Sequence, residues 1–334
     1  MAHILVAGKL HAAGLERLKA APDMTFTLVD EISLDSYLPH VGMADAVILR
    51  TQPMTAEVIA AAPNLKIVSR HGVGYDAVDV KALTARGIPL CIVGDVNSRA
   101  VAEHTLMLML ATARKAAQHD AAVRKGEWNI RNRFETVELD GKNLLLVGFG
   151  RIGRRVAELA RAFGMAVSAY DPFVKPEAMA KHGVRPAADL AKALGCADYV
   201  SLHMPGTTAG GVIREEEIKA MKPGAILVNA ARGGLVDEAA LDRALRGGRL
   251  AGAGLDVFRA EPPAAGDPLL ANDRVLLSPH AAGLTAECAA RMAVASVQNV
   301  LDYFAGRLDP ALVINAAEVA ISPGRPQNGR VTRQ

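Results

Sequence analysis

The sequence predicts an α/β protein with two doubly wound parallel-sheet domains. Short apolar runs alternate with helix-like segments along most of the 334 residues, a pattern typical of βαβ units and a parallel sheet. The alternation falls into two series, separated by a long helical pattern. At about 150 residues per domain the length also fits two domains. The 51% of hydrophobic residues can supply a core to each of them.

The first series supplies four expected strands and the helices between them. The strands are 3–8, 45–50, 65–72 and 89–94, and the helices are 12–20, 55–62 and 77–86. A long helix is expected over 98–126, where Ser98 can act as the N-cap. Its apolar stripe consists of Leu106, Met109, Leu110 and Ala113.

The second series follows this helix and supplies six expected strands. They are 143–148, 166–171, 198–203, 225–230, 251–258 and 275–280, with helical segments between them. A last helix is expected over 285–306, with a buried face formed by Ala293, Val297, Val300, Leu301 and Phe304. The final stretch, 316–334, is rich in Pro, Gly and polar residues, so we expect a flexible tail.

Composition argues against several classes of function. The net charge is +3, and 316–334 contribute +2 of it through three Arg and one Glu. The nearly neutral remainder gives no reason to expect nucleic-acid binding. Cys91, Cys196 and Cys288 lie far apart and form no CxxC pair, which favours a reduced, cytoplasmic setting. No signal peptide, no span of about 18 apolar residues and no histidine spacing typical of zinc is found, so neither a membrane nor a metal is expected.

A glycine-rich turn predicts a dinucleotide site. Gly148, Gly150 and Gly153 form a GxGxxG together with Arg151 and Ile152, directly after an apolar strand and before a helix. The first glycine allows a tight turn, the second lets backbone N–H groups approach a pyrophosphate, and the third permits close helix–strand packing. The helix N-terminus then presents its partial positive charge to the phosphates.

The next strand ends at Asp171, 18 residues after Gly153. A carboxylate there can accept hydrogen bonds from the ribose 2′- and 3′-hydroxyls, and it would repel a 2′-phosphate. No basic residue follows until Lys175. The sequence therefore predicts NAD rather than NADP as the cofactor.

Three ionisable residues follow later strands, and we expect them to be catalytic. Arg232, Glu261 and His280 each lie beyond the carboxyl end of a strand, the edge where doubly wound sheets bind ligands. Arg232 can hold a substrate carboxylate and polarise the C2 oxygen of a 2-hydroxy acid. His280 can take the hydroxyl proton as hydride leaves C2, and return it in the reverse direction. Glu261 would orient the imidazole and favour its protonated form.

These motifs, in this order, resemble the D-isomer-specific 2-hydroxyacid dehydrogenases over roughly 45–315. The resemblance rests on GFGRIG with Asp171, NAARGGLVDEAAL, GLDVFRAEPP and SPHAAGLT. It implies a flavodoxin-like substrate domain, 1–97 with 287–315, a Rossmann NAD domain, 98–286, and a cleft between them. It adds to the expected cofactor site His203, Pro205, Thr208, Ala230, Arg232, Asp256, His280 and Gly283. In SRHGVGYDAVD the backbone of Val73 and Gly74 would receive the substrate carboxylate, where Arg232 and His280 also bind.

The expected substrate is a small 2-hydroxy or 2-keto acid. Arg50 resembles a family residue near the substrate, and Arg70 and His71 precede the substrate loop. Three basic groups favour an acid with a second anionic group, such as 3-phosphoglycerate. The segment NSRAVAEHTL resembles the start of the interdomain helix, and the region around Trp128 resembles the family's dimer-forming region, so a homodimer is expected. Because 28 residues follow 306, the resemblance is to a short form without a regulatory domain.

Three alternatives stay open at this point. Within the family, a glyoxylate/hydroxypyruvate reductase would use the same residues, and the Arg–Glu–His pattern does not by itself exclude phosphite. Formate is disfavoured because the acidic position is Glu261 rather than Gln. From another class, NAD-sensing corepressors share this fold and these three residues, but they would be expected to carry long disordered extensions or peptide-docking features.

Overall fold

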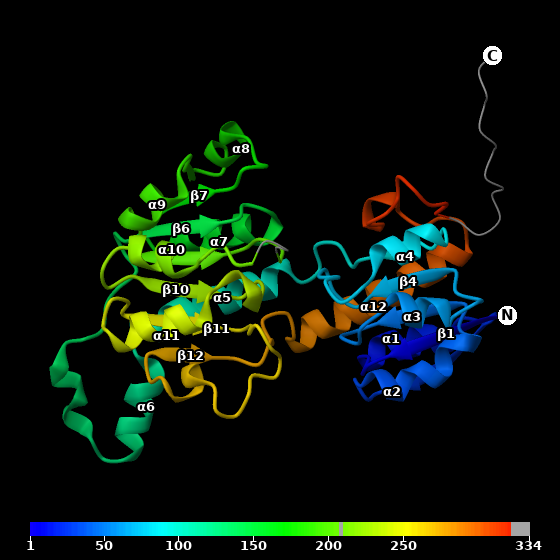
Figure 1. The fold of residues 1–334 in the computed structure, drawn as a ribbon, viewed down its shortest axis with the longest axis horizontal. Helices are drawn as coiled ribbons and strands as arrows, with labels where there is room; N and C mark the ends of the chain where they lie inside the picture. Colours follow the sequence, from blue (N-terminus) through cyan, green and yellow to red (C-terminus); the bar gives the residue numbers. More distant parts are fainter. Residues whose placement is uncertain (207–209, 322–334) are drawn as a thin grey trace. The chain divides into compact units, whose positions relative to one another are not determined.

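The computed structural model describes residues 1–206 and 210–321, which divide into two compact units (Figure 1). Unit 1 is Met1–Asn97 together with the chain from Thr285, and unit 2 is Ser98–Leu284. The second boundary lies two residues before the expected one at 286–287. It lies there because the hydroxyl of Thr285 caps the last helix by accepting a hydrogen bond from the backbone N–H of Cys288, and that helix belongs to unit 1.

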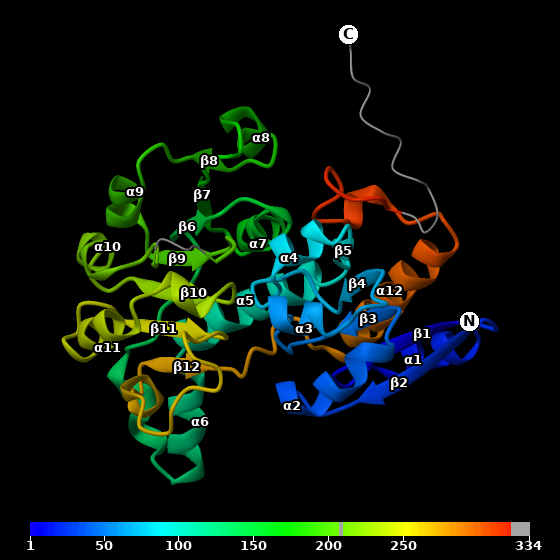
Figure 2. The same cartoon turned by 45° about the vertical axis from the view of Figure 1, so that its right-hand side comes forward.

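Unit 1 contains a five-stranded parallel sheet. Its strands are β1 (Ala2–Ala7), β2 (Met24–Val29), β3 (Ala46–Leu49), β4 (Ile67–Arg70) and β5 (Leu90–Cys91). They lie in the order β2-β1-β3-β4-β5, which can be followed in Figure 2. This is the flavodoxin-like order, and it reverses between β1 and β3. Ligands of such sheets bind beyond the carboxyl ends of the two strands at the reversal.

Helices cover both faces of this sheet. One face packs against α1 (Ala12–Lys19) and α12 (Ala286–Phe304), and the other against α2 (Leu34–Tyr37), α3 (Ala56–Ala60) and α4 (Val80–Ala85). The predicted stripe of α12 supplies Ala293, Val297 and Val300 to the core. Ala316, Val319 and Ile321 also pack against this core, so the first part of the expected flexible tail is held on unit 1. The remainder, 322–334, lies outside the described residues.

Unit 2 contains a seven-stranded parallel sheet. Its strands are β6 (Asn143–Val147), β7 (Ala166–Tyr170), β8 (Arg185–Pro186), β9 (Tyr199–Leu202), β10 (Ile226–Asn229), β11 (Gly252–Leu255) and β12 (Val275–Leu277). The order β12-β11-β10-β9-β6-β7-β8 is that of a Rossmann sheet and reverses between β6 and β9. The predicted pair of doubly wound domains is therefore confirmed.

This sheet also carries a core on each face. The helices α5 (Ser98–Ala113), α7 (Arg151–Ala162) and α8 (Pro176–Ala180) pack on one face. The helices α9 (Leu190–Cys196), α10 (Glu215–Ala220) and α11 (Glu238–Arg246) pack on the other, which Figure 1 shows. None of the described helices is long and apolar enough to cross a membrane.

The single helix expected over 98–126 is wrong in one respect. The helix α5 ends at Ala113, and a second helix, α6 (Ala116–Arg124), begins after Lys115, whose φ is +48°. A left-handed residue ends the helical hydrogen-bond ladder and turns the chain. As a result, α6 and the short 3₁₀ helix Trp128–Arg133 stand away from the sheet as an arm (Figure 1). We call residues 115–137 the arm.

Candidate active site

The glycine-rich turn of unit 2 lies at the point where its strand order reverses, between β6 and β9. A Cβ at Gly148, whose φ is +102°, would lie 2.5 Å from the carbonyl oxygen of His203, which follows β9. A Cβ at Gly153 would lie 2.5 Å from the carbonyl oxygen of Gly148. Because real Cβ atoms do not approach an oxygen so closely, these two positions require glycine. They account for the tight turn and the close helix–strand packing.

Gly150 has a different reason to be glycine. It is the N-cap of α7, its backbone is extended (φ −77°, ψ −157°), and a Cβ there would meet nothing within 4 Å. The open space therefore lies in front of the N-terminus of a 12-residue helix, where backbone N–H groups and the helix dipole favour a phosphate. Arg151 and Ile152 form the first helical residues behind this space. The residues present fit the pyrophosphate of a dinucleotide.

Asp171 lies at the end of β7, next to this turn. The backbone N–H of Phe149 donates to its Oδ2 (2.8 Å), and that of Phe173 donates to its Oδ1 (2.9 Å). Each carboxylate oxygen can accept a second hydrogen bond, so the oxygens remain able to accept from ribose hydroxyls. The two backbone bonds fix the carboxylate beside the glycine turn, which is the position that the expected role requires.

The end of β9 forms the other side of the turn. His203 is partly buried, its Nε2 lies 2.8 Å from the Ser201 hydroxyl, and burial lowers its pKa to about 3. Its imidazole is therefore neutral near pH 7 and adds no charge to the cofactor side. Pro205 follows and is exposed. Thr208 lies outside the described residues.

The three expected catalytic residues follow three neighbouring strands. Asn229 of β10 pairs with Leu255 of β11, and Leu255 pairs with Leu277 of β12, so the carboxyl ends of these strands are level. Arg232, Glu261 and His280 come three, six and three residues after them. The structure therefore brings all three to one edge of the unit 2 sheet.

His280 and Glu261 form the best-defined contact at this edge. Nδ1 of His280 lies 2.6 Å from Oε2 of Glu261, and Oε1 of the same carboxylate accepts the backbone N–H of Phe258 (3.0 Å). One carboxylate oxygen thus contacts the ring, and the other fixes the carboxylate to the backbone. With Nδ1 committed to the carboxylate, Nε2 is the atom able to exchange a proton with a substrate. The side chains are 54% and 37% exposed, so the ring can be reached.

Arg232 lies on the loop after β10, beside the loop that carries Glu261. The carbonyl oxygen of Arg232 accepts a hydrogen bond from the side chain of Asn229 (2.8 Å). The next residue, Gly233, packs so closely that its Cβ would lie 1.9 Å from the carbonyl carbon of Phe258. Only glycine permits this approach, which fixes the two loops against each other. Ala230 begins the same loop and is partly buried.

Asp256, which the resemblance places in the cofactor site, directly follows β11. It is fully buried, and its carboxylate accepts hydrogen bonds from Ser278 and from the backbone of Ala281 and Ala282. Burial raises its pKa, but these bonds and one from His104 together hold the pKa below its ordinary value. The carboxylate therefore stays charged and anchors the segment that carries His280 and precedes Gly283.

Unit 1 has its own cluster of basic residues at the carboxyl edge of its sheet. Arg50 follows β3 and Gly8 follows β1. The two residues are so close that a Cβ added at Gly8 would lie 2.8 Å from the Cβ of Arg50. Arg50 is thus at the reversal point of this sheet. His71 follows β4, is 7% exposed, and its Nε2 has no hydrogen-bond partner. Burial and the charges of Arg50 and Arg70 lower the pKa of His71 to about 4.

The expected substrate loop follows directly. Val73 and Gly74 are partly buried residues of the turn after β4. The backbone N–H of His71 donates to the carbonyl of Leu49 (2.8 Å), and that of Val93 donates to the carbonyl of Gly72 (3.2 Å), so the start of the loop is held between the ends of β3 and β5.

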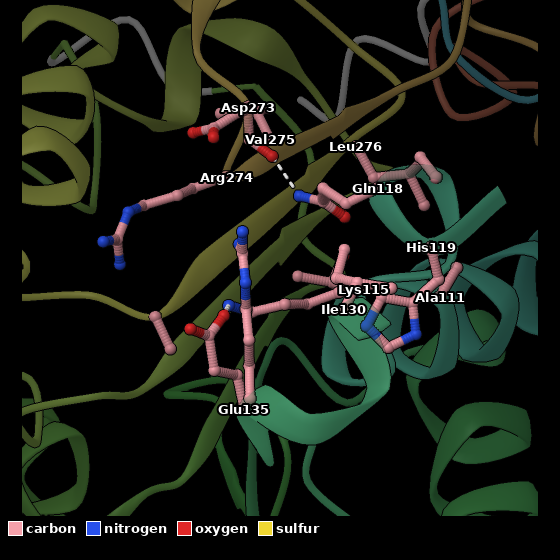
Figure 3. A pocket seen from close by; sticks show the side chains of 14 residues that line it. Ala111, Lys115, Gln118, His119, Ile130, Glu135, Asp273, Arg274, Val275 and Leu276 are labelled. Atoms are coloured by element: carbon pink, nitrogen blue, oxygen red, sulfur yellow. Dashed lines mark hydrogen bonds and ion pairs between the residues drawn. The ribbon is translucent and has the colours of Figure 1, made fainter. Parts of the chain in front are cut away.

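A polar cavity of about 270 Å³ lies elsewhere in unit 2, between α5, the arm and β12 (Figure 3). In its wall the ammonium of Lys115 contacts Glu135 (2.5 Å), and the Gln118 amide donates to the carbonyl of Asp273. Its lining contains neither His280 nor the glycine turn. Within 1–206 and 210–321, no group of three or more His, Cys, Asp or Glu side chains could hold a metal ion.

Comparison with known proteins shows which family the chain belongs to. A sequence model described as "D-isomer specific 2-hydroxyacid dehydrogenase, NAD binding domain" matches residues 106–282, more than half of the chain. The chain is 42% identical over 305 residues to D-3-phosphoglycerate dehydrogenase of Mycobacterium tuberculosis, a match covering 88% of this chain and 57% of the relative. The chain belongs to the D-isomer specific 2-hydroxyacid dehydrogenase family. The family that the motifs predicted is therefore confirmed, as is NAD as its cofactor.

Two further members of this family extend the comparison. Glyoxylate reductase of Korarchaeum cryptofilum is 40% identical over 291 residues, covering 86% of this chain and 87% of the relative. The solved structure of D-lactate dehydrogenase from Aquifex aeolicus, complexed with NAD and lactic acid, has a TM-score of 0.85 at 28% identity. It covers 93% of this chain and 98% of that one. The chain spans little more than half, 57%, of the length of the mycobacterial relative.

Two residues at this edge of the sheet were not predicted from the sequence. Ser278 stands in the motif SPHAAGLT and His104 in NSRAVAEHTL, but neither was given a role. In the structure they lie within hydrogen-bond distance of each other, at 2.8 Å, although 174 residues separate them in the sequence. Both segments were recognised as family motifs, but no rule of sequence spacing predicts a contact between His104 and Ser278.

Asp171→Ala tests the cofactor preference. Removing the carboxylate removes its repulsion of a 2′-phosphate, so the kcat/KM ratio for NADP over NAD should rise at least about tenfold, or about 1.4 kcal/mol. Steady-state kinetics with both cofactors measure this ratio. Glu177→Ala, which removes an exposed acid from the first turn of α8, is the charge-matched control and should leave it unchanged. An unchanged ratio in Asp171→Ala would mean that the ribose is recognised elsewhere.

Proposed function

We propose that the protein is an NAD-dependent oxidoreductase that transfers a hydride between the nicotinamide and C2 of a small D-2-hydroxy acid or 2-keto acid. The observation that carries this proposal is the 2.6 Å contact between His280 Nδ1 and Glu261 Oε2, on the same sheet edge as Arg232 and in the same unit as the dinucleotide turn. A carboxylate-held imidazole and a guanidinium are the two groups that this chemistry requires from the protein.

Each side chain then has a definite task. Bound NAD supplies the hydride acceptor or donor. Arg232 holds the substrate carboxylate and polarises the C2 oxygen by paired hydrogen bonds. Nε2 of His280 takes the proton of the C2 hydroxyl during oxidation and returns it during reduction. Glu261 keeps the ring in place through Nδ1 and stabilises the positive charge that the ring gains.

The proposed substrates carry a second anionic group, as 3-phosphoglycerate does. The support comes from unit 1, where Arg50, Arg70 and His71 gather at the carboxyl edge of the sheet and Arg50 lies at its reversal point. Two guanidinium groups near a buried imidazole favour a dianion over a monoanion. The 42% identity to a D-3-phosphoglycerate dehydrogenase agrees with this substrate class.

A kinetic panel with NADH tests the proposal. Phosphohydroxypyruvate and sulfopyruvate should have higher kcat/KM values than hydroxypyruvate and glyoxylate. In Arg50→Met, kcat/KM for the dianions should fall roughly 10- to 100-fold more than for the monoanions, because a hydrogen bond to a charged group contributes about 1.5–3 kcal/mol. Arg17→Ala, which changes an arginine of α1, is the control and should leave the preference intact. No advantage for the dianions would reject the second-anion proposal.

The same panel separates the alternatives. Highest kcat/KM for glyoxylate or hydroxypyruvate would indicate the reductase that the Korarchaeum relative's name describes. NADH binding without turnover of any 2-keto acid would reject the enzyme and favour an NAD-sensing binding protein.

We further propose that the protein works as a homodimer in the cytoplasm. The arm supports the dimer, because its only buried residue within α6 and the 3₁₀ helix is Ala122, whereas Trp128 and the adjoining Phe134 are 60% and 89% exposed. Large exposed apolar side chains of this kind mark protein–protein contacts. Light scattering of the purified chain would give its mass, and a monomer at micromolar concentration would reject the dimer.

A further inference from the structure

The segment that carries His280 is tied to a single buried carboxylate. Asp256 is 0% exposed. Its carboxylate accepts the Ser278 hydroxyl (2.6 Å) and the backbone N–H groups of Ala281 (2.8 Å) and Ala282 (2.9 Å). Its backbone carbonyl accepts the N–H of His280 itself (2.7 Å). Four of the five residues in the segment 278–282 are thus hydrogen-bonded to one residue at the end of β11.

A second histidine joins this network from a different helix. His104 of α5 places Nε2 2.8 Å from the Ser278 hydroxyl oxygen and 3.4 Å from Oδ1 of Asp256. The serine hydroxyl has one hydrogen, and its 2.6 Å contact assigns that hydrogen to Asp256. The hydroxyl oxygen therefore accepts from Nε2–H of His104. Nε2–H of His104 thus lies nearest to the serine hydroxyl oxygen, with Oδ1 of Asp256 as a second and more distant acceptor.

The network stabilises a strained backbone conformation at His280. His280 has a φ of +51°, in the left-handed region that non-glycine residues rarely occupy. Such a conformation is unfavourable by itself and persists only where surrounding contacts over-determine it. The bonds to Asp256 on both sides of His280 supply those contacts. Relaxation of this φ would turn the ring away from Glu261.

We propose that His104 is a positioning residue for His280. By donating to Ser278 it fixes the serine hydroxyl on Asp256, and Asp256 then holds the left-handed backbone that presents the imidazole to Glu261. His104 does not touch the substrate in this arrangement. The role of His104 in turnover rests on the function proposed above, whereas its role in ring placement does not.

Two substitutions at one position separate the hydrogen bond from simple packing. His104→Leu keeps a side chain of similar bulk but has no donor, whereas His104→Gln places an amide N–H near the position of Nε2. In His104→Leu, kcat should fall roughly 10- to 100-fold, the loss expected when a catalytic group is displaced by about 1 Å, while KM for NADH stays unchanged. His104→Gln should recover most of the loss. Glu103→Ala, an exposed neighbour on α5, is the matched control.

Ser278→Ala removes the hydroxyl that links His104 to Asp256. Because His104 and Ser278 act in series, the double variant His104→Leu/Ser278→Ala should lose no more kcat than the single variant with the larger loss. Additive losses would overturn the proposal, and so would equal losses in His104→Leu and His104→Gln.

A structural readout makes the test independent of turnover. Crystal structures of the wild type and His104→Leu should show the His280–Glu261 contact lengthened and the φ of His280 changed in the variant. Unchanged geometry at 278–282 would overturn the role of His104. A wild type that turns over no 2-keto acid but shows the expected change in His104→Leu would overturn the proposed function alone.

Discussion

His280→Ala should lower kcat for 2-keto acid reduction by roughly 10²- to 10⁴-fold, the contribution typical of a positioned general acid. The loss follows from the geometry, because Nδ1 is bound to Glu261 at 2.6 Å and Nε2 is the nitrogen left to deliver the proton. NADH binding should change little, since the glycine turn and Asp171 lie at the ends of other strands. Single-turnover kinetics measure the hydride-transfer rate, and fluorescence titration measures the Kd for NADH.

His119→Ala supplies the comparison for this result. His119 is a partly exposed histidine of α6, so its loss removes an imidazole from unit 2 without touching the catalytic edge. It should retain full kcat. Equal losses of turnover and NADH affinity in His280→Ala would mean that the residue acts in binding, and the acid–base assignment would be wrong.

Gly150→Val should weaken NADH binding by roughly 10- to 100-fold and cost the free protein clearly less stability than substitutions at Gly148 and Gly153. In the free protein a Cβ at Gly150 meets nothing within 4 Å, and the extended backbone there is open to any residue. The added methyl groups would enter the space that fits the pyrophosphate, where crowding costs about 1–3 kcal/mol. Calorimetric titration with NADH gives the affinity, and thermal unfolding without cofactor gives the stability.

The other two glycines of the turn provide the contrast. Gly148→Ala and Gly153→Ala would each place a Cβ 2.5 Å from a carbonyl oxygen, so both should destabilise the free protein by at least about 2 kcal/mol. If Gly150→Val destabilised the free protein as much as these two, the space at Gly150 would be needed for the fold rather than for the cofactor.

Much of the fold could be predicted from the sequence because buried parallel strands are continuous apolar runs. The strands β3, β6, β9 and β10 are buried almost throughout and lie within the predicted segments. In contrast, β2 was missed, since it lies at an edge, is half-exposed and mixes Thr with apolar residues. The break at Lys115 was also missed, because neither Gly nor Pro marks it.

The candidate site also contains residues that could be predicted from the sequence and residues that could not. Arg232, Glu261 and His280 could be predicted because each follows a strand that the sequence marks, and the carboxyl ends of parallel strands meet at one edge. The anchoring role of Asp256 could not be predicted, because it depends on the turn geometry of 278–282. The link from His104 to Ser278 depends on how α5 packs on the sheet, and only the three-dimensional structure contains that relation.

The insertion of unit 2 into unit 1 has a consequence for synthesis on the ribosome. The face of the unit 1 sheet that carries Ile4, Ile48 and Ile67 is covered by α12, which begins at Ala286. About 190 residues separate β5 from this helix. At a translation rate of 5–20 residues per second, this face of the sheet stays uncovered for roughly 10 to 40 s until α12 has been synthesised. Unit 2 is continuous and can complete its core first. A nascent chain ending at Leu284 would therefore carry one finished domain and one with an apolar face still open to chaperones.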